Sequence, residues 1–220
     1  MEFFAVVESQ RALRRFRQDP VELHDLRRVL EAATRAPSAR GAEPWVFVVV
    51  RDPALRAEIG RRYRDAWDEG ERFTRATDAD RDVRNAAHYE RMMRGAADLA
   101  HSLHEAPVLI VCGLDHARLG PLAAPDGSLR APAAAYASIF PAVQNLLLAA
   151  RALGLGTTLT TLHRTFEAEL KTLLALPDHV EVAALVPLGW PRDRFGPTRR
   201  RPLDEVAALD RWGTPLPETD

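Results

Sequence analysis

The sequence has little of several residues and patterns, and each shortage narrows the choice of protein class. Cys112 is the only cysteine among 220 residues, so an internal disulfide is impossible. No apolar run approaches the roughly 20 residues that a membrane helix needs, and the start of the chain lacks the basic-then-apolar pattern of a signal peptide. We therefore expect a cytoplasmic protein with no membrane partner.

Lysine is almost absent as well, since Lys171 is the one lysine among 30 basic residues, against 31 acidic ones. A formal net charge of -1 does not supply the basic face that nucleic-acid binding usually needs, so we expect no nucleic-acid partner. With 46% hydrophobic and 28% charged residues, the composition is that of a folded globular protein. No repeat or shift in composition divides the chain, which favours a single domain over residues 1–220.

Signatures of several kinds of catalytic site are also missing. Residues 154–156 hold two glycines but no third at the required spacing, and they follow a helical pattern, so they are no dinucleotide fingerprint. The chain has no Gly-x-Ser-x-Gly elbow. His101 and His104 lie one helical turn apart without the zinc-protease order, and we expect no metal site. Cys112 lies in an apolar run, which favours a buried, inert thiol over a nucleophile.

The pattern that is present alternates helices with short apolar strands, which predicts an α+β fold. The segment at residues 133–153 is alanine- and leucine-rich and nearly uncharged, as expected for a helix in a core or a subunit interface. The predicted helices are residues 3–8, 20–36, 53–67, 133–153 and 166–174, and the predicted strands are residues 45–50, 108–113, 157–162 and 180–188.

Two further segments have open interpretations. Residues 68–103 begin densely charged and become more helical, so they are either a solvated excursion or a lid over a site. Residues 191–220 are rich in proline and arginine and cannot fold alone, which predicts an arm lying across another surface. Arginines cluster at residues 11–15 and again at 199–201. They are either two separate basic patches or, if the fold joins them, a phosphate site.

Four segments together resemble the FMN-dependent nitroreductase family. Residues 11–16 fit its Arg-Ser-x-Arg-x-Phe opening, and residues 36–45 are similar to its Ala-Pro-Ser motif followed by Glu-Pro-Trp or Gln-Pro-Trp. Residues 144–157 resemble its central helix and the turn after it, and residues 187–203 resemble its C-terminal signature. The four occur in the family's order over nearly the whole chain, which makes the resemblance specific.

The resemblance implies a three-layer sandwich, with a central mixed, largely antiparallel sheet wrapped by helices, in an intertwined homodimer. It places the FMN site between two subunits, with Arg11, Arg14 and Arg200 on the phosphate and the Ser38 loop serving the flavin held mostly by the partner. The C-terminal arm would cover the neighbour. The implied cofactor-binding residues are Gln10, Arg11, Ala12, Leu13, Arg14, Pro37, Ser38, Leu159, Thr160, Thr161 and Arg200.

The activity implied is an NAD(P)H oxidoreductase. NADPH or NADH would deliver hydride to flavin N5, and a nitroaromatic, quinone or similar electron-poor acceptor would then take the electrons in a ping-pong cycle. Thr161 would place its hydroxyl near N5 and tune the flavin. Two alternatives stay open: specialised flavin chemistry, such as reductive dehalogenation or substrate desaturation, and a flavin-binding module without turnover.

The sequence departs from the family pattern at the phosphate and flavin loops. Ala12 replaces a serine hydroxyl, Gly41 stands where many members have asparagine, and Glu43 replaces the commoner glutamine. Glu43 gives the second motif its Glu-Pro-Trp form, which resembles the iodotyrosine deiodinase branch of the family more than the Gln-Pro-Trp form does.

Three residues are candidates for contacting the substrate. Glu69 and Phe73 fit the deiodinase lid motif Glu-x-x-x-Tyr only in part, because Phe73 lacks the hydroxyl and the insertion has no lysine, which disfavours deiodination. Arg40 would favour an anionic or polar acceptor, and a plain surface arginine is an equally good interpretation.

Overall fold

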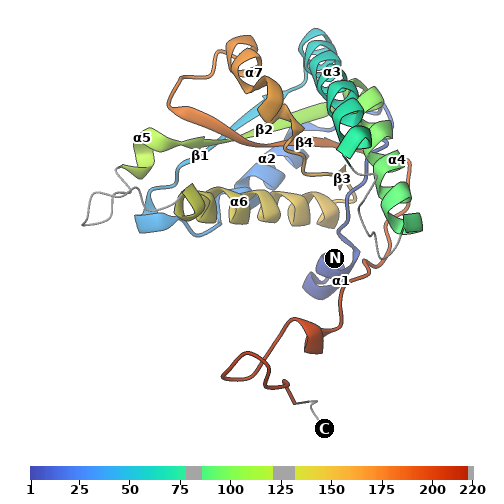
Figure 1. The fold of residues 1–220 in the computed structure, drawn as a ribbon. Helices are drawn as coiled ribbons and strands as arrows, with labels where there is room; N and C mark the ends of the chain where they lie inside the picture. The colour runs from blue at the N-terminus through green and yellow to red at the C-terminus, as the bar shows by residue number, and fades with distance from the viewer. Residues whose placement is uncertain (78–85, 121–131, 218–220) are drawn as a thin grey trace.

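The computed structural model describes residues 1–77, 86–120 and 132–217, and it has three layers, helices on sheet on helices (Figure 1). The helices are α1 (Phe3–Ser9), α2 (Leu23–Ala33), α3 (Pro53–Thr77), α4 (Ala86–Ser102), α5 (His116–Leu119), α6 (Pro132–Ala152) and α7 (Glu167–Leu173). The strands are β1 (Trp45–Val50), β2 (Val108–Asp115), β3 (Gly156–Thr157) and β4 (Val180–Gly189). No helix among the described residues is long and apolar enough to cross a membrane.

The sheet has the strand order β1-β2-β4-β3, and each of these pairings is antiparallel. A parallel bridge between Ala12 and Thr157 joins the N-terminal loop to its β3 edge and adds the one parallel element among the described pairings. The predicted α+β class with a central, largely antiparallel sheet is therefore confirmed.

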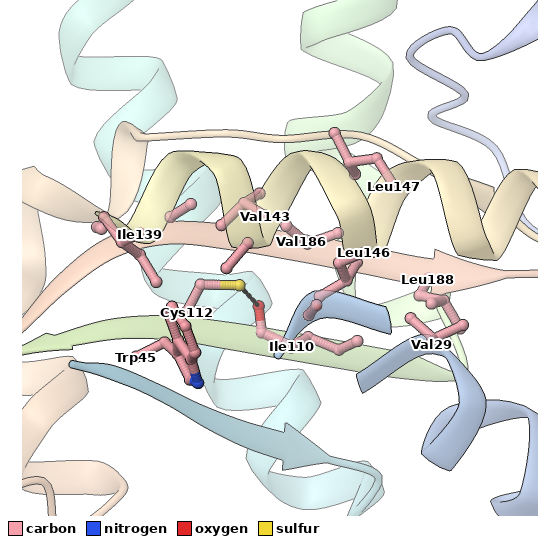
Figure 2. Packing of buried hydrophobic residues seen from close by; sticks show 14 of the residues in the cluster. Val29, Trp45, Ile110, Cys112, Ile139, Val143, Leu146, Leu147, Val186 and Leu188 are labelled. Atoms are coloured by element: carbon pink, nitrogen blue, oxygen red, sulfur yellow. Dashed lines mark hydrogen bonds between the residues drawn. The ribbon is translucent and has the colours of Figure 1, made fainter. Parts of the chain in front are cut away.

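Alternation along β2 divides the core between the two faces of the sheet. One face of β2 packs against α2 and α6 through its even-numbered residues, Val108, Ile110, Cys112 and Leu114. The other face packs with α3, α4 and α7 through Leu109 and Val111. Burial on both faces explains the near-continuous apolar run in the sequence. Figure 2 shows Cys112 inside this packing, and burial raises the pKa of its thiol, as expected for an inert cysteine.

Two elements depart most from the sequence-based prediction. The helix expected to end at Trp67 continues through the charged segment to Thr77, because that segment contains no proline and its glutamate and arginine residues favour a helix. The strand expected over 157–162 is limited to Gly156–Thr157. Beyond it only Thr160 pairs with the sheet, through two backbone hydrogen bonds of 3.0 Å with Leu185, and the segment becomes a loop.

Two glycines allow the N-terminal loop to lie against the end of the sheet. Gly156 and Gly189 are paired across β3 and β4. A Cβ on Gly156 would lie 3.3 Å from Leu13 Cβ, and one on Gly189 would lie 2.6 Å from Pro107 Cδ and 3.4 Å from a ring carbon of Phe16. The close approach sets the position of the loop that carries the first arginine cluster.

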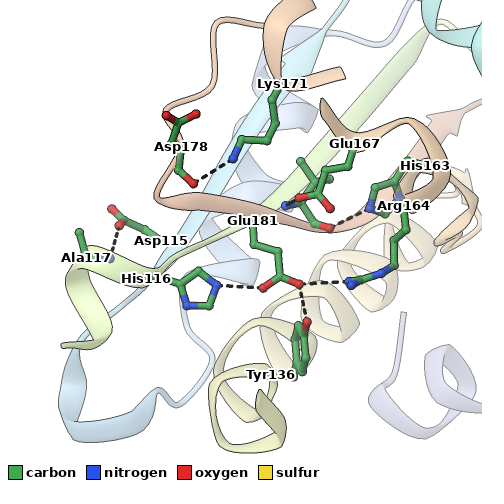
Figure 3. A network of polar contacts seen from close by, with 11 residues as sticks. Asp115, His116, Ala117, Tyr136, His163, Arg164, Glu167, Lys171, Asp178 and Glu181 are labelled. Carbon is green, nitrogen blue, oxygen red and sulfur yellow. Dashed lines mark hydrogen bonds and ion pairs between the residues drawn. The ribbon is translucent and has the colours of Figure 1, made fainter. Parts of the chain in front are cut away.

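A polar network ties the start of β4 to three other segments (Figure 3). Glu181 contacts His116 at 2.8 Å and Arg164 at 3.1 Å, and it accepts a hydrogen bond from the Tyr136 hydroxyl. Burial of Glu181 opposes ionisation, but the hydrogen bonds from Tyr136, His116 and Arg164 outweigh it and hold the pKa of Glu181 below its ordinary value. The network fixes the segment around Arg164, which follows the loop at residues 158–161, here called the threonine loop.

Substituting Gly189 by alanine is predicted to destabilise the protein by about 1–3 kcal/mol, because the added methyl group overlaps Pro107. Urea unfolding at fixed protein concentration measures the effect. Gly70→Ala is the matched control, since nothing lies within 4 Å of its Cβ position and alanine favours a helix. An unchanged midpoint for Gly189→Ala would show that the close approach does not constrain the fold.

Glu181→Gln is predicted to lower the free energy of unfolding at pH 7 by about 1.5–3 kcal/mol, the range for a hydrogen bond to a charged group. A carboxylate with a lowered folded pKa stabilises the fold above its unfolded pKa, and that contribution is lost as the pH falls. The variant should therefore lose stability less steeply than the parent between about pH 5 and pH 3. Glu31→Gln, at an exposed site, should keep the parent's pH profile. Parallel profiles for Glu181→Gln and the parent would contradict the assignment.

Candidate functional site

The N-terminal loop presents its arginines outward because its apolar residues are anchored inward. Leu13 and Phe16 are buried, and the Leu13 amide donates to Thr157 O at 2.9 Å. Arg192 from the C-terminal segment donates from Nε to Phe16 O at 2.8 Å. This anchoring leaves Arg11 and Arg14 on the outer side of the loop, beside α4.

These arginines open onto a cavity of about 610 Å³, here called the basic cavity. Its lining residues are Arg11, Ala12, Leu13, Arg14, Arg15, Arg91, Arg94, Gly95, Ala97, Asp98, Asp193 and Arg194. Arg15 is hydrogen-bonded to Asp193, which raises the pKa of the guanidinium. Arg11 and Arg14 make no hydrogen bond or ion pair with the residues that the structure describes. Unpaired guanidinium groups in a concave site are suited to a phosphate.

A second cavity, of about 350 Å³, adjoins the first at Arg14, which lines both. It is called the threonine cavity here, and its other lining residues are Tyr63, Trp67, Ala96, Leu99, Thr158, Leu159, Thr160, Thr161 and Leu162. The two cavities together offer charge at one end and aromatic, aliphatic and hydroxyl groups at the other. A ligand with a phosphate and a planar ring matches this distribution.

Hydrogen bonds fix the threonine loop from the side of α3. The Tyr63 hydroxyl lies 2.7 Å from Thr160 Oγ1, and burial raises the pKa of Tyr63, so the phenol is neutral near pH 7. One turn further along α3, the buried Trp67 Nε1 has no hydrogen-bond partner among the described residues. Because a buried N–H donor is costly when unpaired, Trp67 is a candidate donor to a bound ligand.

The far end of the threonine loop is held by a buried histidine. His163 Nε2 lies 2.8 Å from Val182 O, and burial lowers the pKa of the imidazole, which keeps it neutral. Arg164 then joins the Glu181 network (Figure 3). Thr160 and Thr161 are thus fixed between contacts on α3 and contacts on β4.

α4 lines the threonine cavity together with the threonine loop, and it approaches Arg14 closely at Gly95. A Cβ on Gly95 would lie 3.3 Å from Arg14 Nη1, so a larger residue there would crowd the guanidinium. α4 falls within the predicted lid at 68–103, and residues 78–85 of that segment lie outside the described residues. The described residues of α4 contribute lining side chains to both cavities.

The structure brings together only part of the predicted site. Arg11, Ala12, Leu13 and Arg14 line the basic cavity, and Leu159, Thr160 and Thr161 line the threonine cavity. Gln10 caps the end of α1, where its backbone N–H donates a hydrogen bond to Val6 O, and it lines neither cavity. Glu69 is exposed on α3, and the side chain of Phe73 lies outside those described.

The second predicted loop lies apart from both cavities of its own chain. The Glu43 amide donates to Ser38 Oγ at 3.0 Å, and the Ala39 amide donates to Ser138 Oγ on α6 at 3.1 Å. Pro37 and Arg40 belong to the same loop, and Arg40, Gly41 and Glu43 have φ angles of 55°, 66° and 46°. Glycine and asparagine adopt this left-handed region most readily, which explains how Gly41 replaces the family's asparagine.

The C-terminal arginines are arranged differently from the simple two-cluster prediction. The chain does return to the first cluster, since the Thr198 amide donates to Glu8 O and the Gly196 Cβ position lies 3.8 Å from Arg11 Nη1. The arginine from this segment that lines the basic cavity is Arg194. Arg200 is exposed further along the tail, and its Nη1 donates to Arg199 O at 2.9 Å.

Sequence reasoning missed the residues that α3 and α4 contribute. Tyr63 and Trp67 are spaced by four residues, and Arg91 and Arg94 by three, so each pair shares one helix face. The spacing was a readable signal for a shared face. The cavity that each face lines depends on tertiary packing.

Comparisons with known proteins agree with this fold. The chain matches the family model of the nitroreductase family over residues 7–190. It is 33% identical to a protein named NADH dehydrogenase from Thermus thermophilus, over 90% of this chain and 91% of that one. It is 30% identical to 5,6-dimethylbenzimidazole synthase from Rhodospirillum rubrum, over 90% of each chain.

A solved structure extends the likeness to a ligand-bound relative. Iodotyrosine deiodinase bound to FMN and 3-iodo-L-tyrosine superposes with a TM-score of 0.68 at 25% identity, covering 96% of this chain and 99% of that one. The order of motifs, the three-layer fold and these matches lead to one conclusion: the chain belongs to the nitroreductase family, a family of oxidoreductases.

Proposed function

We propose that this protein is an FMN-dependent NAD(P)H oxidoreductase that reduces nitroaromatic, quinone or similar electron-poor acceptors. The observation that carries the proposal is the junction at Arg14 of a basic cavity with a cavity of threonine and aromatic side chains. FMN has the matching shape, a phosphate at one end and a planar ring at the other. FMN in the deiodinase structure and the name of the Thermus relative support the same reading.

The donor set at the phosphate end fits FMN. Arg11 and Arg14 offer two unpaired guanidinium groups to a phosphate that carries close to two negative charges at pH 7. Ala12 has no hydroxyl to add, so the arginines supply the binding on this loop. In this arrangement Gly95 leaves Arg14 the room to turn toward the ligand.

The threonine cavity would hold the ring. When bound, FMN supplies two-electron chemistry, accepting reducing equivalents from a nicotinamide and passing them to the acceptor. Leu159, Thr160 and Thr161 would line the ring, with the Thr161 hydroxyl available as its hydrogen-bond donor. Tyr63 keeps Thr160 in place. Trp67 Nε1 offers a donor to an oxygen of the ring or of a stacked acceptor. Nitro and quinone oxygens are acceptors of this kind.

We also propose that the functional unit is a homodimer. The Ser38 loop contributes to neither cavity of its own chain, so in a dimer it would serve the partner's flavin. α1 exposes Phe3 and Phe4, and the tail exposes Val206 and Trp212, the latter 87% exposed. Figure 1 shows this tail extending away from the body. A second copy would cover these apolar groups and complete the site.

Arg14→Ala should weaken FMN binding by about 10- to 100-fold, as expected for the loss of a charge-assisted hydrogen bond of about 1.5–3 kcal/mol. Titration of FMN into flavin-free protein, followed by flavin fluorescence, measures the dissociation constant. Arg28→Ala on the exposed side of α2 is the matched control and should bind FMN as the parent does. Equal affinity for Arg14→Ala and the parent would place the phosphate elsewhere.

Light scattering should give twice the 24.5 kDa chain mass. The double substitution Val206→Ser and Trp212→Ser should shift the protein toward monomer at low concentration, because it removes apolar surface that the partner would cover. Leu23→Ser, at another exposed apolar residue, should leave the mass unchanged. A monomeric parent protein would contradict the dimer.

A further inference from the structure

The basic cavity carries more positive charge than a single phosphate needs, because six arginines and two aspartates line it, and part of that charge comes from α4. Arg91, Arg94, Gly95 and Asp98 all line the basic cavity, and their spacing of three, four and seven residues makes them a continuous stripe on the helix. Gly95 meets Arg14, so the stripe faces the N-terminal arginines. Arg91 and Arg94 therefore approach the cavity from the side opposite Arg11.

The charges within the cavity do not balance. Both lining carboxylates lie beside Arg15, which is hydrogen-bonded to Asp193 and attracted by Asp98. Among the described residues Arg94 forms one ion pair, an exposed pair with Glu90 at 3.7 Å, and such pairs contribute little. Arg91 has no ion pair with a described residue. After Arg11 and Arg14 have bound one phosphate, the two arginines of α4 still face the cavity without an anion.

We infer that Arg91 and Arg94 bind the 2′-phosphate of NADPH and so make this protein prefer NADPH over NADH. The inference rests on the proposed FMN function, because it assigns the first phosphate to Arg11 and Arg14. NADPH differs from NADH only in this phosphate, which carries close to two negative charges at neutral pH. Arginine forks match its oxygens in the same way as those of other phosphates.

The distance along α4 favours a long ligand over a small anionic acceptor. Leu99 lines the threonine cavity and Arg91 lines the basic cavity. Eight residues of helix separate them, which is about 12 Å along the axis. A small aromatic carboxylate stacked in the threonine cavity would not reach Arg91. A dinucleotide whose nicotinamide stacks on the flavin ring at the threonine cavity spans such a distance through its pyrophosphate and ribose groups.

The test is equilibrium binding of NADP⁺ and NAD⁺ to the FMN-loaded, oxidised protein, measured by titration calorimetry. NADP⁺ should bind the parent about tenfold or more tightly than NAD⁺, the effect of one charge-assisted hydrogen bond. The double variant Arg91→Gln, Arg94→Gln should lose that advantage with NAD⁺ binding unchanged. The double variant Arg27→Gln, Arg28→Gln removes two exposed arginines from α2 and should behave as the parent.

Equal affinities for the two nucleotides in the parent, or no binding of either, would overturn the inference. So would an equal loss for both nucleotides in the α4 variant, or a loss of acceptor turnover without any change in nucleotide binding. The flavin absorbance of the same samples distinguishes failure of the NADPH inference from failure of the proposed FMN function. A parent protein that does not retain FMN contradicts the proposed function itself.

Discussion

Several guanidinium groups that have no partner among the described residues converge on one cavity, and the arrangement of the site depends on that unbalanced charge. Like charges brought together repel, and folding brings Arg11, Arg14 and Arg91 around the same space without enough carboxylates to neutralise them. A bound phosphate removes the repulsion and gains hydrogen bonds at the same step. The fold tolerates the arrangement because these side chains stay partly in water.

The apolar framework determines where that charge is held. The two-sided burial of β2 fixes the sheet, and the paired glycines at the end of β3 and β4 let the N-terminal loop approach it closely. The same edge continues into the threonine loop, whose ends are fixed by Tyr63 and by His163. Arg14 and Thr161 therefore line adjoining cavities although 147 residues separate them in the sequence.

The layers of the fold could be predicted from the sequence, and so could the two loops of the site, but not the residues that α3 and α4 contribute to it. The apolar run at residues 108–113 predicted a buried strand, because that signal is local. The arginine clusters alone left a phosphate site and separate basic patches both open, and the family resemblance assigned Arg11 and Arg14 to a phosphate. The end of α3 was misplaced because exposed charged residues do not distinguish a helix from a loop. The contribution of Arg194, rather than Arg200, to the basic cavity depends on how the tail crosses α1, and no local pattern encodes that path.

The most direct test of the account is an absorbance spectrum of the purified protein without oxygen, before and after NADPH is added and then after a quinone or nitroaromatic is added. The account predicts an oxidised flavin band that bleaches with NADPH and returns with the acceptor. A protein that shows no flavin band even after incubation with FMN, or a band that NADPH and NADH both leave unchanged, would contradict it.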